Sequence, residues 1–152
     1  MKTSIIAVGR MKQGPLLDLY QDYAKRLTPS PKLIEVEAKK NLSGDALKTA
    51  EAELIHHATP PHAVRVVLDE RGALVSSSDL SRKLEQWRTG GFGEVCFILG
   101  GADGHTEATR QTGQWVWSLS PLTFPHMLAR VLLVEQLYRA QQISSGHPYH
   151  RV

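Results

Sequence analysis

Residues Glu94–Leu99 form a nearly continuous apolar run that ends directly at Gly100 and Gly101, and this feature constrains the fold most. A strand that is apolar on both faces must be covered on both. Such burial is typical of a central strand in a parallel sheet with helices on either side. Glycines at the end of such a strand allow backbone amides to approach a ligand. The run therefore predicts an α/β fold with a ligand site at the carboxyl end of this strand.

The rest of the chain alternates between strand-like and helix-like segments. Apolar runs predict strands at residues 4–8, 33–36, 62–69 and 94–99, with 33–36 at an edge and a further short apolar segment at 114–119. Apolar side chains at helical spacing predict helices within residues 16–27, 47–58, 80–87 and 126–143. Residues 70–72 are predicted to form a turn. This alternation favours a mainly parallel sheet with helices on both faces, in a single domain over residues 1–152.

Composition narrows the class of protein further. Hydrophobic residues make up 41% of the 152 residues, and 18 Lys and Arg against 15 Asp and Glu give a net charge of +3. This modest positive charge favours a nucleic-acid partner without establishing one. The single cysteine, Cys96, excludes a disulfide or a cysteine-based metal site within one chain. No apolar run approaches the ~20 residues of a membrane span, so a cytoplasmic protein that binds no membrane is expected.

Two regions of the last third carry residues suited to chemistry. Gly100–Gly104 is neither a dinucleotide fingerprint nor a Walker loop, and a simple tight turn remains an alternative. The segment His147–Arg151 combines two histidines, a tyrosine and an arginine, which suit base stacking, phosphate binding and proton transfer. A solvated tail is the alternative reading. His126 is a candidate proton carrier or a helix-boundary residue, and Arg139 is a phosphate ligand or a solvated side chain. No clustered acids complete a metal ligand set, so no metal is expected.

Four segments, read together, resemble the RlmH (YbeA-like) family of ribosomal RNA large subunit pseudouridine methyltransferases. They are Phe97–Gly104, Trp117–His126, Arg130–Arg139 and His147–Arg151. The resemblance extends over essentially the whole chain in length and order of elements, while the specific motifs lie in the last third. It implies a SPOUT fold, in which the C-terminal segment passes through a loop to form a deep trefoil knot, with the knot and cofactor site within about residues 95–152.

The resemblance also implies a set of site residues. It places S-adenosylmethionine (SAM) in the knot, against Leu68, Gly100, Leu119, Ser120, Pro121, Leu122, Thr123 and Phe124. For catalysis we nominate His126, Arg139, Tyr149, His150 and Arg151. The family consists of homodimers in which the second subunit completes the RNA site. Relatives often have a proline or serine, and an apolar residue after the final glycine, where this chain has Ala102–His105.

The implied reaction is methylation of N3 of a pseudouridine in 23S rRNA, on the large subunit or the assembled ribosome. That nitrogen is a weakly acidic imide, so a nearby histidine or positive charge would promote loss of its proton. Two alternatives remain open on sequence alone. One is a non-catalytic, dimeric RNA-binding or ribosome-associated factor, and the other is a methyltransferase of the same fold that acts on tRNA.

Overall fold

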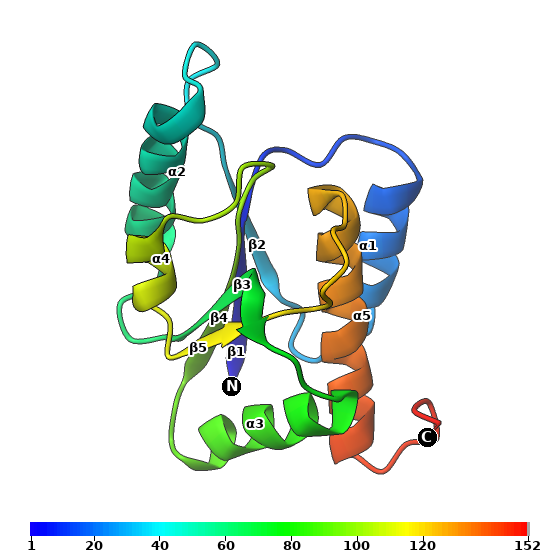
Figure 1. Ribbon diagram of the computed structural model, residues 1–152. Coiled ribbons are helices and arrows are strands. Elements are labelled where there is room, and N and C mark those ends of the chain that lie inside the picture. The colour runs from blue at the N-terminus through cyan, green and yellow to red at the C-terminus, as the bar shows by residue number, and fades with distance from the viewer. Residues whose placement is uncertain (152) are drawn as a thin grey trace.

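The computed structural model describes residues 1–151, whose strands form one parallel sheet in the order β2-β1-β4-β3-β5 (Figure 1). The strands are β1 (Lys2–Val8), β2 (Lys32–Val36), β3 (Val64–Ala73), β4 (Glu94–Leu99) and β5 (Trp115–Trp117). The helices are α1 (Pro15–Arg26), α2 (Gly44–Ala58), α3 (Ser77–Thr89), α4 (Glu107–Gln111) and α5 (His126–Ser144). The predicted parallel α/β sheet is confirmed, with β4 in its centre and β2 at its edge.

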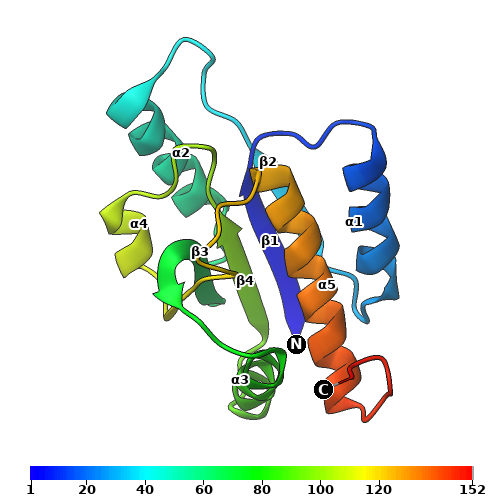
Figure 2. The same ribbon diagram turned by 45° about the vertical axis from the view of Figure 1, so that its right-hand side comes forward.

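Helices cover both faces of the sheet (Figures 1 and 2). Successive residues of β1 point to opposite faces, as in any strand. Ile5 belongs to the core formed with α1, α3 and α5. Ile6 belongs to the second core, with α2. Cys96 is fully buried in that second core, and burial raises the pKa of its thiol to about 12, so it packs as a small apolar side chain.

The turn predicted at residues 70–72 is wrong, because β3 continues through them to Ala73. The pairing with β5 shifts instead: both Leu68 and Ala73 lie opposite Trp117, so the residues between them form a bulge. The Asp69 carboxylate accepts a hydrogen bond from the Arg71 amide at 2.9 Å, which stabilises the bulge. A Cβ atom on Gly72 would lie 2.7 Å from the Trp117 backbone, so the close approach of the two chains requires glycine.

The connections that follow β1, β2 and β4 and the loop before α5 lie at the carboxyl edge of the sheet (Figure 1). α5 begins at His126, as predicted, and a short helix that the sequence pattern did not reveal, α4, follows the glycine turn. The side chain of Thr106 caps α4 by accepting from the Thr109 amide at 3.1 Å. This edge therefore gathers the glycine turn, the bulge and the start of α5 around one space.

Two expectations lie beyond this description. The trefoil knot stays a prediction, and so does the single domain, whose last residue, Val152, lies outside the described residues. None of the helices described in residues 1–151 is long and apolar enough to cross a membrane.

Candidate active site

A cavity of about 430 Å³ opens at the carboxyl edge of the sheet, a volume typical of sites for small molecules. The ends of β3 and β4, the glycine turn, the loop 118–124 and the first turn of α5 line it. Among the lining residues are seven of the eight predicted cofactor contacts: Leu68, Gly100, Leu119, Ser120, Leu122, Thr123 and Phe124. His126 lines the same cavity, whereas the exposed Pro121 does not. The structure thus brings most of the predicted cofactor residues together.

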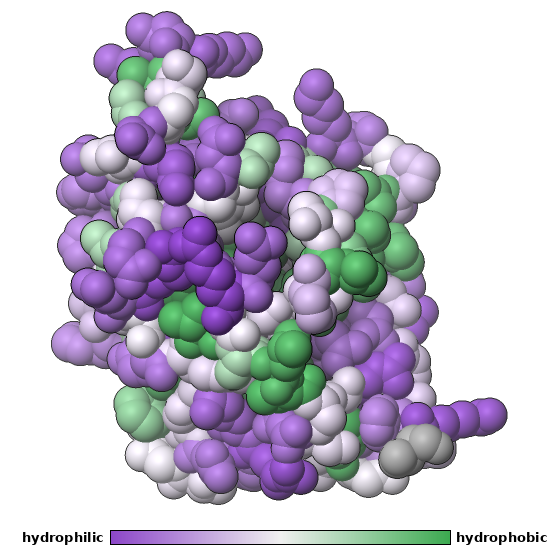
Figure 3. All heavy atoms as spheres, viewed as in Figure 1, coloured by the Kyte–Doolittle hydropathy of each residue, from purple (hydrophilic) through white to green (hydrophobic). Residues whose placement is uncertain are grey.

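The cavity has an apolar side and a charged side. The apolar side consists of Leu68, Leu119, Leu122, Phe124 and Ala129. The charged side consists of Lys48, Asp69, Glu70, Arg71, Asp103 and Arg110. Figure 3 shows hydrophilic atoms over α4 and the end of β3, and hydrophobic atoms across a hollow, over α5 and the loop before it. The cavity suits a ligand with one apolar, ring-like part and one charged part.

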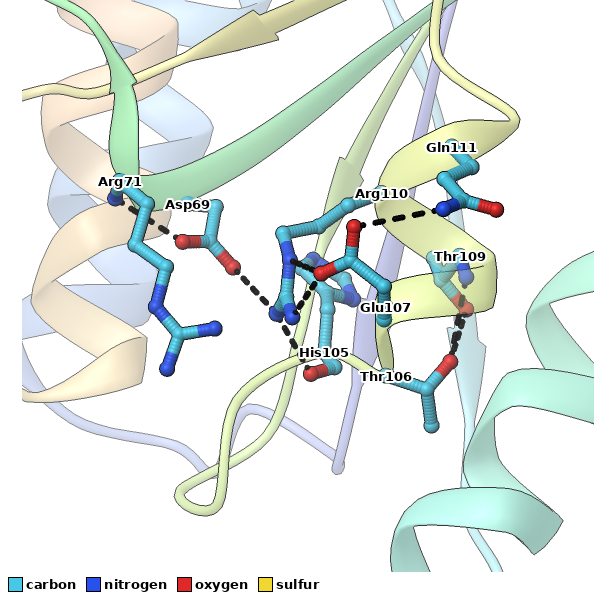
Figure 4. A network of polar contacts seen from close by, with 8 residues as sticks. All are labelled: Asp69, Arg71, His105, Thr106, Glu107, Thr109, Arg110 and Gln111. Carbon is cyan, nitrogen blue, oxygen red and sulfur yellow. Dashed lines mark hydrogen bonds and ion pairs between the residues drawn. The ribbon is translucent and has the colours of Figure 1, made fainter.

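A network of polar contacts builds the charged side (Figure 4). Arg110 Nη1 donates to Asp69 Oδ2 at 3.4 Å and to the His105 carbonyl at 2.9 Å, and its Nη2 donates to Glu107 at 2.6 Å. The Asp69 and Arg110 side chains are only 8% and 14% exposed. The network fixes the Asp69 carboxylate at the cavity wall.

His105 lies behind this wall. The side chain is 4% exposed, and its Nε2 atom has no hydrogen-bond partner among the described residues. Burial lowers the pKa of the imidazole, so the ring is neutral near pH 7. A Cβ atom on Gly100 would lie 3.2 Å from both His105 Cε1 and the Gly104 carbonyl carbon. The ring therefore packs directly against the backbone of the glycine turn.

His126 lies at the start of α5 beside a buried arginine. Arg130 is 1% exposed and donates to the carbonyls of Val8 and Gly9 at 2.7 Å each, and to Glu35 at 2.8 Å. Burial, and then the charge of Arg130, lower the pKa of His126. A neutral imidazole at the cavity wall is suited to accept a proton.

Two of the predicted catalytic residues, Arg139 of α5 and Tyr149 of the tail, contact one carboxylate, that of Glu135. Arg139 donates from Nε and Nη2 to Glu135 Oε1 at 3.0 and 2.5 Å. Tyr149 donates to the same oxygen at 3.2 Å. His150 Nδ1 lies 3.4 Å from Arg139 Nη1, and Arg151 is exposed. The tail therefore folds back onto α5, contrary to the solvated-tail reading.

Tyr149 is held as a neutral hydroxyl in this cluster. Burial raises its pKa above the ordinary range, and the hydrogen bond to Tyr23 and the charge of Glu135 raise it further. A tyrosine whose pKa is raised donates a hydrogen bond at neutral pH and does not act as a base. Among the nominated residues, the two histidines are left as the candidates to accept a proton.

The tail cluster and the cavity lie at different positions along α5. His126 and Arg139 are separated by 13 positions in this helix, or roughly 20 Å along its axis. Within one chain, the structure places His126 in the cavity and does not bring Arg139, Tyr149 or His150 to it.

Comparison with known proteins decides the family. Residues 1–150 match the family described as "Predicted SPOUT methyltransferase". This chain belongs to the SPOUT methyltransferase family. It therefore requires a methyl donor, and the cavity at the carboxyl edge of its sheet is the candidate donor site.

Curated relatives of this SPOUT methyltransferase match it over nearly its whole length. A protein named Ribosomal RNA large subunit methyltransferase H from Paramagnetospirillum magneticum is 48% identical over 99% of each chain. Proteins of the same name from Rhodospirillum centenum and Roseobacter denitrificans are 46% and 43% identical, again over 99% of each chain. The recognised family resemblance is thus confirmed.

Solved structures confirm the SPOUT fold of this methyltransferase. A probable methylase family protein from Haemophilus influenzae Rd KW20 matches 99% of this chain and 70% of its own, with a TM-score of 0.59 and 13% identity. TrmJ from Z. mobilis ZM4 matches 93% of this chain and 70% of its own, with a TM-score of 0.53 and 12% identity. At such low identity the likeness concerns the fold alone.

Several polar residues of this SPOUT methyltransferase were not nominated from the sequence. Arg71 and Arg110 line the cavity. Glu135 accepts hydrogen bonds from Arg139 and Tyr149. Asp69 had a usable signal, since it directly follows the apolar end of a predicted strand. Arg110 and Glu135 had no such signal in the sequence, because only the fold brings them next to the residues that they contact.

Proposed function

We propose that this SPOUT methyltransferase transfers a methyl group from SAM to N3 of a pseudouridine in 23S rRNA of the large ribosomal subunit. The observation that carries the proposal is the cavity, which gathers seven of the eight predicted cofactor residues together with His126. The names of the full-length relatives support the ribosomal substrate. Such a substrate implies that the enzyme acts in the cytoplasm.

In this scheme the chain's own residues bind and orient the methyl donor and the RNA base, and one of them removes a proton. SAM supplies an electrophilic methyl group on a sulfonium, so the protein must mainly align donor and acceptor. The loop 118–124 is internally fixed, since Ser120 Oγ accepts from the Leu122 amide at 2.9 Å and Ser118 Oγ donates to the Ser120 carbonyl at 3.0 Å. This loop and the apolar side of the cavity would hold the adenosine of SAM. The neutral imidazole of His126 accepts the proton from N3 of the pseudouridine. Positively charged side chains of the tail stabilise the resulting anion.

A second copy of the chain supplies the tail in this proposal. His126 and Arg139 lie roughly 20 Å apart along α5, so one chain alone does not combine cavity and tail. Leu16 and Leu19 are 37% and 43% exposed on α1, which packs beside α5. An exposed apolar strip next to the tail helix is a suitable surface for a homodimer. We therefore propose that each active site combines the cavity of one subunit with residues 149–151 of the other.

Transfer of a labelled methyl group from SAM tests the proposed function. Intact ribosomes, free large subunits, naked 23S rRNA and tRNA are offered separately, and the labelled nucleoside is identified by mass spectrometry. We expect label at N3 of a pseudouridine in the large subunit, free or assembled, and none in tRNA. Transfer to none of the four, with SAM binding intact, would support the non-catalytic factor. Label in tRNA alone would support the tRNA enzyme.

Substituting Gly100 by alanine is expected to weaken binding of SAM about tenfold or more. The added Cβ would lie 3.2 Å from the Gly104 backbone and the His105 ring, so the turn must shift by a few tenths of an ångström. Isothermal titration with S-adenosylhomocysteine measures the change. The matched control is Gly93→Ala, because a Cβ at Gly93 meets no atom within 4 Å. Unchanged binding by the Gly100 variant would place the cofactor elsewhere.

The rate of methyl transfer is expected to fall at acid pH as His126 becomes protonated. Only the neutral imidazole accepts a proton, and burial and Arg130 lower its pKa below the ordinary 6.5. The rate should therefore hold down to pH 6.5 and decline below it. Single-turnover assays between pH 5 and 8, on wild type and His126→Gln, measure the profile. An acid limb that persists in the variant would identify another group as the base.

A further inference from the structure

The charged side of the cavity is not explained by a nucleoside alone. A nucleoside has hydroxyls and ring nitrogens but no charge, and the apolar wall with the loop 118–124 suits it. SAM also has an amino-acid end, whose ammonium and carboxylate groups are attached to one carbon atom. A site for that end needs an anion and a cation side by side.

Asp69 is the anion at this wall. Its side chain is 8% exposed, and the Arg71 amide and the Arg110 guanidinium hold its two oxygens at 2.9 and 3.4 Å (Figure 4). A carboxylate accepts about four hydrogen bonds, so capacity for a ligand remains. Because the group is already fixed and largely desolvated, it can pair with an ammonium ion without further ordering.

Arg71 is the adjacent cation. It lies in the bulge of β3, two residues beyond Asp69, and lines the cavity. Arg110 is engaged by Asp69, Glu107 and the His105 carbonyl. Figure 4 shows no contact of the Arg71 guanidinium with the other residues drawn. Its planar fork matches the geometry of a carboxylate.

We propose that Asp69 binds the ammonium group and Arg71 the carboxylate of the cofactor's amino-acid end, with Arg110 positioning Asp69. This assignment rests on the proposed use of SAM, and it specifies the orientation of the cofactor in the cavity. The adenosine then lies against the loop 118–124 and the apolar side of the cavity. The sulfonium, between the two ends, lies in the cavity that His126 also lines.

Two ligands that differ in the amino-acid end test the assignment. S-adenosylhomocysteine carries this end, and 5′-methylthioadenosine lacks it. We expect Arg71→Ala to weaken binding of S-adenosylhomocysteine about tenfold and to leave binding of 5′-methylthioadenosine unchanged, as measured by calorimetry. Asp69→Asn should show the same selectivity. Arg71 is exposed, so its variant tests the idea even if the Asp69 variant is unstable.

Arg10→Ala is the matched control, because Arg10 is an exposed arginine near the same edge of the sheet but outside the cavity lining. It should leave binding of both ligands unchanged. Equal affinity of wild type and Arg71→Ala for S-adenosylhomocysteine would overturn the assignment and leave the proposed function standing. So would an equal loss of affinity for both ligands. If neither ligand bound the wild type, the proposed cofactor and this assignment would both fall.

Discussion

Replacing both His150 and Arg151 by alanine is expected to lower kcat for methyl transfer by about 100-fold or more. In the proposed mechanism these tail residues meet the RNA base and stabilise the charge that develops when N3 loses its proton. Neither residue is among the predicted cofactor contacts, so SAM binding should not change. Single-turnover transfer to large subunits measures the rate, and titration with S-adenosylhomocysteine measures binding.

The folding of the tail provides a control for this variant. Tyr149 stays in place in the double variant, and with it the bonds to Glu135 and Tyr23. Loss of activity should therefore reflect the removed side chains and not a detached tail. His147→Ala is a matched control, since His147 is exposed and, within residues 1–151, its ring accepts a single hydrogen bond, from the nearby Tyr149 amide at 3.2 Å. Turnover within twofold of wild type in the double variant would contradict a role for the tail.

Co-expression of two inactive chains tests whether the subunits share their sites. One chain carries His150→Ala and Arg151→Ala, and the other carries a cavity substitution such as Gly100→Val. In a mixed dimer of the proposed kind, one site combines an intact cavity with an intact tail. Random pairing would then restore about a quarter of the sites. No recovery of activity would show that each chain uses its own tail.

The sheet and its ligand edge were predictable because they depend on local pattern. The apolar run at 94–99 predicted a central strand, and glycine after it predicted a site at its carboxyl end. Alternating segments predicted α5 from its first residue. These features arise from side-chain burial within single elements, which leaves a direct trace in the sequence.

The polar architecture could not be predicted in the same way. Glu70–Gly72 has the composition of a turn, yet the chain continues as a bulged strand because Gly72 packs on the backbone of Trp117. Arginine side chains are mostly exposed in folded proteins, yet Arg130 is 1% exposed. Its partners, Val8, Gly9 and Glu35, lie at least 95 positions away. Such contacts are set by the assembled fold and leave no periodic signal.

Substituting Arg130 by methionine is expected to lower the free energy of unfolding by about 3–5 kcal/mol, because three hydrogen bonds donated by one buried guanidinium are lost together. The change removes donors from the Val8 and Gly9 carbonyls and from Glu35 Oε2. Methionine fills similar space but offers no hydrogen-bond donor, so the buried Val8 carbonyl loses the bond from Arg130. Urea denaturation monitored by tryptophan fluorescence measures the loss, and the melting temperature should fall by about 10 °C.

Glu35→Gln separates the charge of the pair from its hydrogen bonds. Glutamine keeps an oxygen that can accept from Arg130 and from the Met11 amide, now 2.8 and 2.7 Å away. Glu35 is also 28% exposed, so water screens its charge. The expected cost is therefore only about 1 kcal/mol. A loss below 1 kcal/mol for Arg130→Met would show that water replaces the missing donor. A loss near 4 kcal/mol would instead show that the hydrogen bonds from Arg130 to Val8, Gly9 and Glu35 hold α5 against the end of β1.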